Sequence, residues 1–347
     1  MSFPISCAAQ VQSSFNRAVA LLHSFAYAPA AEAFAQVARE DPGCAMAHWG
    51  IAISYYHQLW QPPLPTDTLQ QGRAELERAQ QIGTSDAKEK EYLAAASLLF
   101  TQDGDAYAVH AAKYRDAMAA LAQAHPDAES QIFYALALLA TANPQDKTHQ
   151  NQKAAAQILE PLHHRYPQHP GVTHYLIHAY DNAELAAQGL QAAREYSQIA
   201  PSAPHALHMP SHIFPRLGMW NDSMRSNQAA RAAAHQQGDV GEELHSMDYL
   251  VYASLQEGRD ADAATVIKDL QGMGSLAAGD FKLGYAATAM PVRYAVERKQ
   301  WSDAARCVAP AEAPPQVAAL AAWLVLWETL TPVMPPQPAP SCSHSSV

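Results

Sequence analysis

The sequence predicts an all-α fold, a right-handed superhelical solenoid of about seven to eight helical hairpins. An aromatic residue, an Ala-rich helical segment and an Asp-Pro pair recur together at a spacing of roughly 34 to 42 residues, which is typical of helix-hairpin repeats. Apolar residues make up 49% of the 347-residue chain and charged residues only 16%, a composition that suits closely packed helix pairs. No segment alternates polar and apolar residues as a strand does.

The clearest repeat begins at Phe25 and ends at Asp41-Pro42. Pro42 ends one helix because proline interrupts helical hydrogen bonding, and small residues after Cys44 begin the next where two helices must approach closely. Further first helices of hairpins are expected at Glu89–Phe100, Glu129–Leu139, Val172–Tyr180, His205–Leu217, Glu243–Leu255 and Tyr285–Glu297.

Cap and turn signals mark the ends of these helices. Asp86 stands three residues before Glu89, a spacing that predicts a capping box. Gly218 and Gly258 predict turns between paired helices. We expect one solenoid domain over residues 1–330, followed by a disordered tail over residues 331–347, because Pro and Ser dominate the tail.

Charge and composition exclude several partners. The net charge of -11, from 22 Lys and Arg against 33 Asp and Glu, argues against a nucleic acid or an anionic membrane as partner. The start of the chain lacks the pattern of a signal peptide, and no stretch has the length of a membrane helix. These observations favour a cytoplasmic protein, and they leave its oligomeric state open.

The four cysteines are far apart and form no Cys-x-x-Cys pair. Their spacing predicts neither a disulfide framework nor a thiolate zinc site, and it favours a reducing compartment. The cysteines are Cys7, Cys44, Cys307 and Cys342.

Three segments carry a resemblance to a known family. Residues Asp41–Gly50, the His-Tyr-Leu-Ile-His-Ala-Tyr-Asp motif of His174–Asp181 and the His-rich motif of Ala203–Phe214 resemble a widespread group of bacterial tetratricopeptide repeat (TPR) proteins. The resemblance covers most of the chain, roughly from Phe15 to Ala309. It implies a TPR-like fold, and it implies no reaction.

Histidines gather in the central repeats. In TPR proteins the first helix of each repeat lines the concave groove, and aligning the repeats on their turn residues assigns histidines to groove positions. His174 and His178 are four residues apart and so share one helix face. The alignment gives the same face to His205, His208 and His212 in the next repeat, and to His245 with Asp248 in the one after. Pro210 and Pro215 interrupt the second of these helices and predict a bend.

Six imidazoles on one surface predict a metal site. Histidines four residues apart on a helix are a recurrent ligand pair, and an all-nitrogen donor set favours copper, with zinc or iron as alternatives. Six ligands suffice for two ions. His23 and His57 join the set if the superhelix curls round, whereas His163, His164 and His169 are interpreted as solvated or capping residues.

The leading hypothesis is a metal-dependent oxidoreductase, a copper oxygenase or oxidase that acts on a small molecule or a peptide held in the groove. Asp181 or Asp248 then orients an imidazole or exchanges protons, and Arg293 binds an anionic group of the substrate. Two alternatives stay open. One is a TPR adaptor or metal carrier without turnover, and the other is a pH-sensitive pocket for an acidic or peptide ligand.

Overall fold

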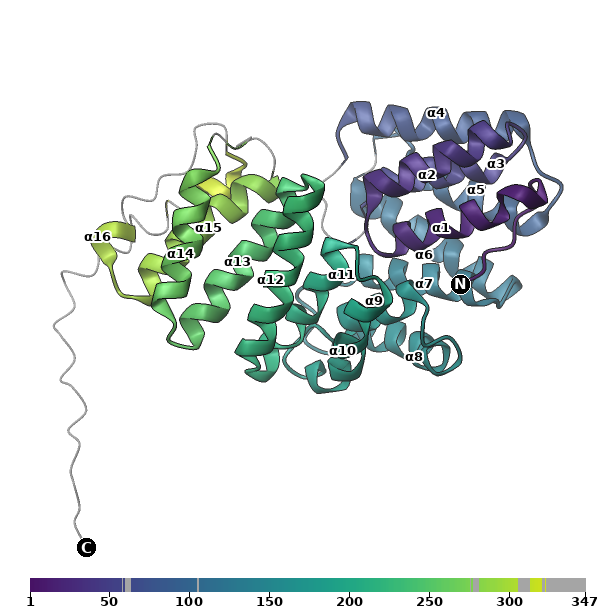
Figure 1. The fold of residues 1–347 in the computed structure, drawn as a ribbon. Coiled ribbons are helices and arrows are strands. Elements are labelled where there is room, and N and C mark those ends of the chain that lie inside the picture. Colours follow the sequence, from purple (N-terminus) through teal and green to yellow (C-terminus); the bar gives the residue numbers. More distant parts are fainter. Residues whose placement is uncertain are drawn as a thin grey trace, which may run out of the picture. The chain divides into compact units, whose positions relative to one another are not determined.

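The computed structural model describes most of the chain: residues 1–57, 59, 64–104, 106–274, 276, 281–304, 313–319 and 322. Within these residues the protein is all-helical and contains no strand (Figure 1). The chain divides into two compact units, Met1–Ala233 and Ala234–Val347. The predicted tail, residues 331–347, lies outside the described residues, and the single domain over 1–330 stays a prediction.

The first unit holds most of the helices. Its α-helices are α1 (Gln12–His23), α2 (Tyr27–Glu40), α3 (Ala45–Ser54), α4 (Thr66–Ile82), α5 (Ala87–Leu99), α6 (Tyr107–Ala124), α7 (Ala128–Ala140), α8 (Gln150–Arg165), α9 (Pro170–Tyr180), α10 (Leu190–Ile199) and α11 (Pro204–His208). Its 3-10 turns are η1 (Ala9–Val11), η2 (Ala186–Gly189), η3 (Met209–His212) and η4 (Pro215–Leu217). Helix α12 (Trp220–Gln237) begins in this unit and continues past its end.

The second unit contains α13 (Val240–Gln256), α14 (Asp260–Gly272), α15 (Phe281–Glu297) and α16 (Trp301–Ala304). Helix α13 packs against both α14 and α15. The Asp239 side chain caps α13 by accepting a hydrogen bond from the backbone N–H of Glu242 at 3.0 Å.

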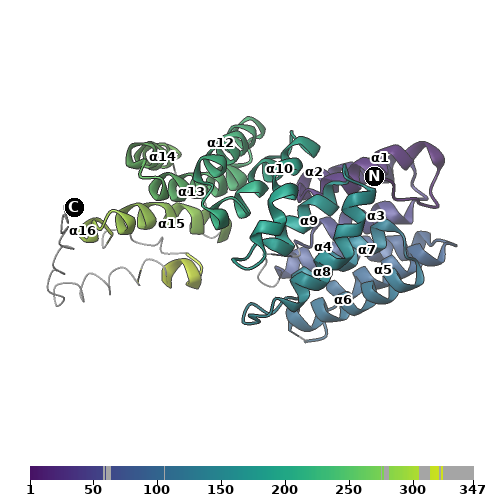
Figure 2. The same cartoon turned by 90° about the horizontal axis from the view of Figure 1, so that it is seen from below.

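Helices of the first unit pack in chain order, and this packing closes on itself. Each helix from α1 to α9 contacts the one that follows it, and α1 also packs against α9, far along the chain (Figure 2). Gly171 permits this close approach, because a Cβ atom there would lie 2.7 Å from Nδ1 of His23. Helix α1 therefore lies against α9, the helix that carries His174 and His178.

An aromatic core fills the inner side of this unit. Phe3 of the N-terminal segment inserts between Phe15 of α1, Trp49 of α3 and Tyr92 of α5, with ring centroids 5.1 to 5.6 Å away. All four rings are fully buried, with Phe133 of α7 beside them. Large rings in such tilted contacts contribute much of the apolar burial that holds the early helices together.

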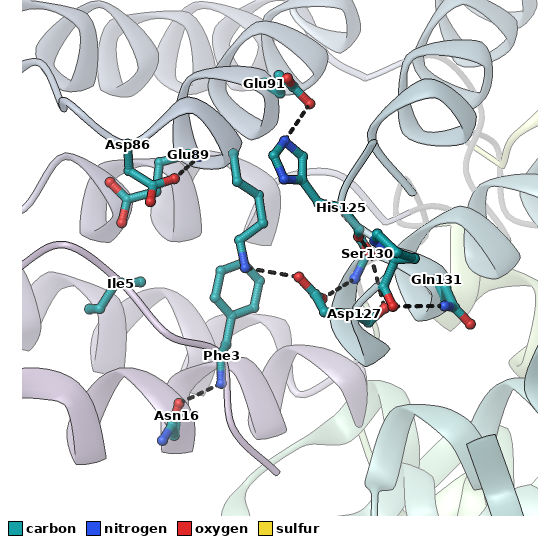
Figure 3. A network of polar contacts seen from close by, with 12 residues as sticks. Phe3, Ile5, Asn16, Asp86, Glu89, Glu91, His125, Asp127, Ser130 and Gln131 are labelled. Carbon is teal, nitrogen blue, oxygen red and sulfur yellow. Dashed lines mark hydrogen bonds and ion pairs between the residues drawn. The ribbon is translucent and has the colours of Figure 1, made fainter. Parts of the chain in front are cut away.

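The predicted capping box at Asp86 forms only in part. Asp86 caps α5 by accepting from the backbone N–H of Glu89 at 3.0 Å, and Asp127 caps α7 in the same way (Figure 3). The Glu89 carboxylate does not return the bond to Asp86. It accepts from the Ser6 hydroxyl at 2.6 Å and so anchors the N-terminal segment that carries Phe3.

The prediction that the cysteines form no disulfide is wrong. Cys7 and Cys44 are joined by a disulfide across 37 residues. The N-terminal segment lies over the start of α3, where the Asp41 carboxylate accepts from the backbone N–H of Ala8 at 2.8 Å and holds the two cysteines together. Because disulfides persist in oxidising surroundings, the expectation of a reducing compartment loses the support it drew from cysteine spacing.

The predicted first helices match α5, α7, α9, α13 and α15 to within a few residues at most ends. Gly218 and Gly258 occupy left-handed turns with φ of 69° and 73°, as predicted. The bend predicted from Pro210 and Pro215 is also confirmed, since the expected helix is divided into α11, η3 and η4. The TPR assignment and the handedness of the superhelix stay predictions.

Substituting Gly171→Ala tests the closure of α1 on α9. The added methyl group would collide with the His23 ring, so we expect a loss of about 1–3 kcal/mol in the free energy of unfolding, measured by urea denaturation. Gly272→Ala is the control, because a Cβ atom there meets nothing within 4 Å. Equal midpoints for Gly171→Ala and the wild type would contradict the described closure.

Candidate metal centre

Three predicted histidines converge in the first unit. We call His174 and His178 of α9 and His205 of α11 the His174 triad. Nε2 of His174 lies 3.1 Å from Nε2 of His178 and 3.3 Å from Nε2 of His205. One nitrogen from each residue lies within 4.8 Å of the other two. The structure thus brings these three predicted residues together, and their place in a concave groove stays a prediction.

Two further histidines meet on the adjoining 3-10 turn. His208 and His212, here called the His208 pair, bring their Nε2 atoms to 3.2 Å. Pro204 starts α11, and Pro210 converts the next turn to 3-10 geometry, yet His208 and His212 still share one side of the segment. The pair lies beside the triad, with the rings of His178 and His212 5.7 Å apart.

A hydrogen bond across α1 and α9 fixes the tautomer of His174. Its Nδ1 lies 2.6 Å from the backbone carbonyl oxygen of His23. A carbonyl can only accept, so this Nδ1 carries the proton. In the neutral ring Nε2 therefore presents a lone pair to His178 and His205, the arrangement that a metal ligand requires.

The His208 pair has the same protonation. Nδ1 of His212 donates to the Asp181 carboxylate at 2.8 Å, and Arg216 donates to the other oxygen of Asp181 at 3.0 Å. Nδ1 of His208 lies 2.7 Å from Oδ1 of Asn227. The Asn227 amide group donates to the carbonyl of Ser223, so Oδ1 must accept from His208.

Burial favours the uncharged form of His174 and His178. Burial, followed by the nearby His205, lowers the pKa of His174 well below its usual value, and burial with His174 lowers the pKa of His178 in the same way. Asp181 stays ionised: burial raises its pKa, but His212 and Arg216 outweigh it and leave a net lowering. Neutral imidazoles beside an anionic orienting group are the form that binds transition metals.

The nitrogen spacing fits a metal ion. Two nitrogens each about 2.0–2.1 Å from one ion stand about 3.3 Å apart at a tetrahedral angle. The separations of 3.1 and 3.3 Å within the triad match this value. Without a cation, the single lone pair on Nε2 of His174 faces two other ring nitrogens and accepts a good hydrogen bond from only one of them.

Phe25 packs against the triad from the turn between α1 and α2. Its ring centroid lies 4.4 Å from His174, 5.4 Å from His205 and 5.8 Å from His178. Phe25 has a left-handed φ of 54°, which is uncommon for a bulky residue and is found mostly where surrounding structure enforces it. The half-buried ring therefore forms part of the wall of the site.

His23 belongs to a separate cluster. Its Nε2 lies 3.0 Å from the Glu129 carboxylate and its Nδ1 lies 2.9 Å from the Tyr175 hydroxyl. His169 approaches the other oxygen of Glu129 at 3.0 Å, and this set also has the composition of a metal site. His23 serves the triad through its backbone carbonyl, whereas its ring faces Glu129.

The interpretation of His163 and His169 as solvated or capping residues is wrong. His169 is 3% exposed and bonded to Glu129, and His163 is 9% exposed and lies 2.9 Å from Glu195. His169 precedes Pro170, and Glu129 stands in the first turn of α7. Both positions are usually solvated in a helix, so the sequence carried no signal for the buried pairing.

The Glu129 carboxylate is buried as an anion between two histidine rings. Burial acts to raise the pKa of Glu129, but hydrogen bonds from His169 and His23 outweigh it and lower the pKa to about 2. Burial lowers the pKa of His23, against the opposing effect of Glu129. We therefore assign an ionised carboxylate that accepts one imidazole N–H group from His23 and one from His169.

The remaining predicted residues are not part of the triad: His57 lies in the first unit, and the others lie in the second unit. His57 stacks on Tyr27 at 4.0 Å, and Tyr27 stacks on Phe25. In the second unit His245 packs on Tyr249, and Arg293 is ion-paired with the buried Asp248. The metal role of His57 and His245 and the catalytic roles of Asp248 and Arg293 stay predictions.

Replacing Glu129 with Gln tests the charge of the buried cluster. Its folded pKa of about 2 lies below the unfolded value of 4.5, so the carboxylate stabilises the fold fully above pH 4.5, and the stabilisation falls as the pH drops toward 2. The free energy of unfolding of the wild type should exceed that of Glu129→Gln by about 3 kcal/mol at pH 7. This difference should shrink by about 2 kcal/mol between pH 5 and pH 3. A difference independent of pH, measured by urea denaturation, would contradict the ionised assignment.

Comparisons with known proteins leave the function to be inferred from the side chains. No family model matches the chain, and a search of curated proteins returns no match. Across the described part of the chain, no helix combines the length and apolar character required to cross a bilayer.

Proposed function

We propose that this protein is a metal-dependent oxidoreductase, a copper oxygenase or oxidase whose metal is bound by the His174 triad. The observation that carries the proposal is the convergence of three Nε2 atoms, with those of His178 and His205 at 3.1 and 3.3 Å from that of the buried His174, whose tautomer is fixed by the carbonyl of His23. Such a site is preorganised, since the ligand rings need no rearrangement to receive an ion.

The donor set favours copper over other ions. Imidazole nitrogen suits copper, zinc and iron, whereas magnesium and calcium prefer oxygen. Hydrolysis by zinc ranks lower, because the sequence has no His-Glu-x-x-His pattern that would place a general base beside the ligands. Copper would supply one-electron exchange with dioxygen at this site.

The protein's own residues supply orientation and shielding. His23 and Asp181 hold imidazoles of the two histidine groups in the ligand tautomer. Phe25 and the buried Tyr196, which stacks on His174 at 5.1 Å, surround the triad with aromatic rings. A low-polarity wall of this kind limits water access and strengthens local electrostatic interactions.

The half-buried stack of Phe25, Tyr27 and His57 offers a surface beside the triad on which a substrate could bind. Its rings are spaced at 5.2 and 4.0 Å and are partly exposed. Such a surface suits a small organic molecule or a peptide with an aromatic or apolar group. A carrier of copper without turnover is the alternative that uses the same ligands.

Elemental analysis and oxygen consumption test the proposal. We expect purified protein loaded with copper(II) to retain metal after desalting and to consume oxygen with a reducing phenolic or thiol substrate. His178→Ala should lose the ion bound by the triad, because it removes a ligand. Its rate of oxygen consumption should fall at least 100-fold, which is about the upper end of the losses seen when a metal site is weakened. Its helical circular dichroism should persist, because repeats of this type do not fold around one site.

His164→Ala is the matched control, since this histidine is exposed on α8. It should leave both metal content and oxygen consumption unchanged. If the protein retains copper but consumes no oxygen with any substrate, the copper-carrier hypothesis would replace the oxidoreductase hypothesis. Failure to retain copper, zinc or iron would overturn both.

A further inference from the structure

We infer that the His208 pair binds a second metal ion beside the one held by the His174 triad, so that the site is a two-ion centre. The inference rests on the proposed metal site and deepens it. It follows from where the protons of His208 and His212 must be, which the structure fixes through two acceptors on different elements.

The first step concerns the outer nitrogens of the pair. The carboxylate of Asp181 accepts from Nδ1 of His212, and the amide oxygen of Asn227 accepts from Nδ1 of His208, at 2.8 and 2.7 Å. Both groups act as acceptors: the Asp181 carboxylate also accepts from Arg216 through its other oxygen at 3.0 Å, and the Asn227 amide N–H group donates to Ser223. Both histidines therefore use Nδ1 as donor.

The second step concerns the inner nitrogens. With Nδ1 protonated, a neutral ring leaves a lone pair on Nε2, and the two Nε2 atoms face each other at 3.2 Å. Two nitrogens that present lone pairs at this distance have the geometry in which one metal ion takes both as ligands. A metal ion about 2.0–2.1 Å from each nitrogen would hold the two about 3.3 Å apart, close to the 3.2 Å found between these buried rings.

The third step separates this ion from the first. The nitrogens of His174, His178 and His205 form a group within 4.8 Å of one another, and that group includes neither His208 nor His212. Each set also has its own orienting acceptor: the His23 carbonyl for the triad, and Asp181 with Asn227 for the pair. The rings of the two sets are nevertheless only 5.7 and 6.2 Å apart. Two ions on these ligands would be neighbours able to act on one small molecule.

The metal content of variants tests the second ion. The protein is incubated with copper(II) sulfate and desalted, and copper is measured per chain. We expect two copper ions per chain in the wild type, one in His212→Ala and one in His178→Ala. The exposed His164→Ala should keep two.

Asp181→Asn supplies a second variant that spares every ligand. Loss of the orienting carboxylate should weaken binding of one copper by about 10 to 100-fold and leave the other unchanged, as measured by competition with a chelator. If circular dichroism shows that His212→Ala does not fold, the copper affinity of Asp181→Asn tests the second ion in its place.

The outcomes separate the second ion from the proposed function. One copper in the wild type that persists in His212→Ala overturns the second ion and leaves the triad site standing. One copper that is lost in both His178→Ala and His212→Ala also overturns it, since all five histidines would then share one ion. Two ions without oxygen consumption uphold the inference and overturn the oxidoreductase.

Discussion

The site depends on one hydrogen bond, from Nδ1 of His174 to the backbone carbonyl of His23 at 2.6 Å. This bond joins α9 to the end of α1, 151 residues earlier in the chain. It orients the ring at the middle of the triad and decides which nitrogen carries the proton. Because the acceptor is backbone, its position is set by the path of α1, so the first helix is as much a part of the site as the ligands are.

The contacts around that bond hold the carbonyl in place. Glu129 and Tyr175 bind the ring of His23 from α7 and α9, and Gly171 leaves room for that ring. The ionised Glu129 is costly to bury, yet it accepts two imidazole hydrogen bonds, each of the charge-assisted kind that is worth about 1.5–3 kcal/mol. A buried anion that fixes the end of α1 therefore acts on the triad through the backbone, without contacting a ligand ring.

Much of the fold and part of the site could be predicted from sequence. The spacing of His174 and His178 predicts a shared helix face, and Pro210 and Pro215 predict the bend, because both depend on local geometry. The partners on other elements could not be predicted. Glu129 and His169 occupy positions that are usually solvated, and the Cys7 to Cys44 disulfide depends on where the N-terminal segment packs. The strained turn at Phe25 likewise follows from tertiary packing and not from its residue type.

The energetics of the five histidines argue for a ligand and against a structural role. Apolar residues of similar volume would fill the same space without the desolvation cost that polar groups incur on burial, about 1–3 kcal/mol for each one left poorly paired. The protein instead fixes Nδ1 of His174, His208 and His212 with well-formed hydrogen bonds and directs their Nε2 atoms toward other ring nitrogens. Hydrogen bonding accounts for only one of the two contacts at Nε2 of His174, and in the neutral tautomers assigned above it does not account for the contact between His208 and His212. A metal ion would account for all three contacts, because it can take lone pairs from several ring nitrogens at once.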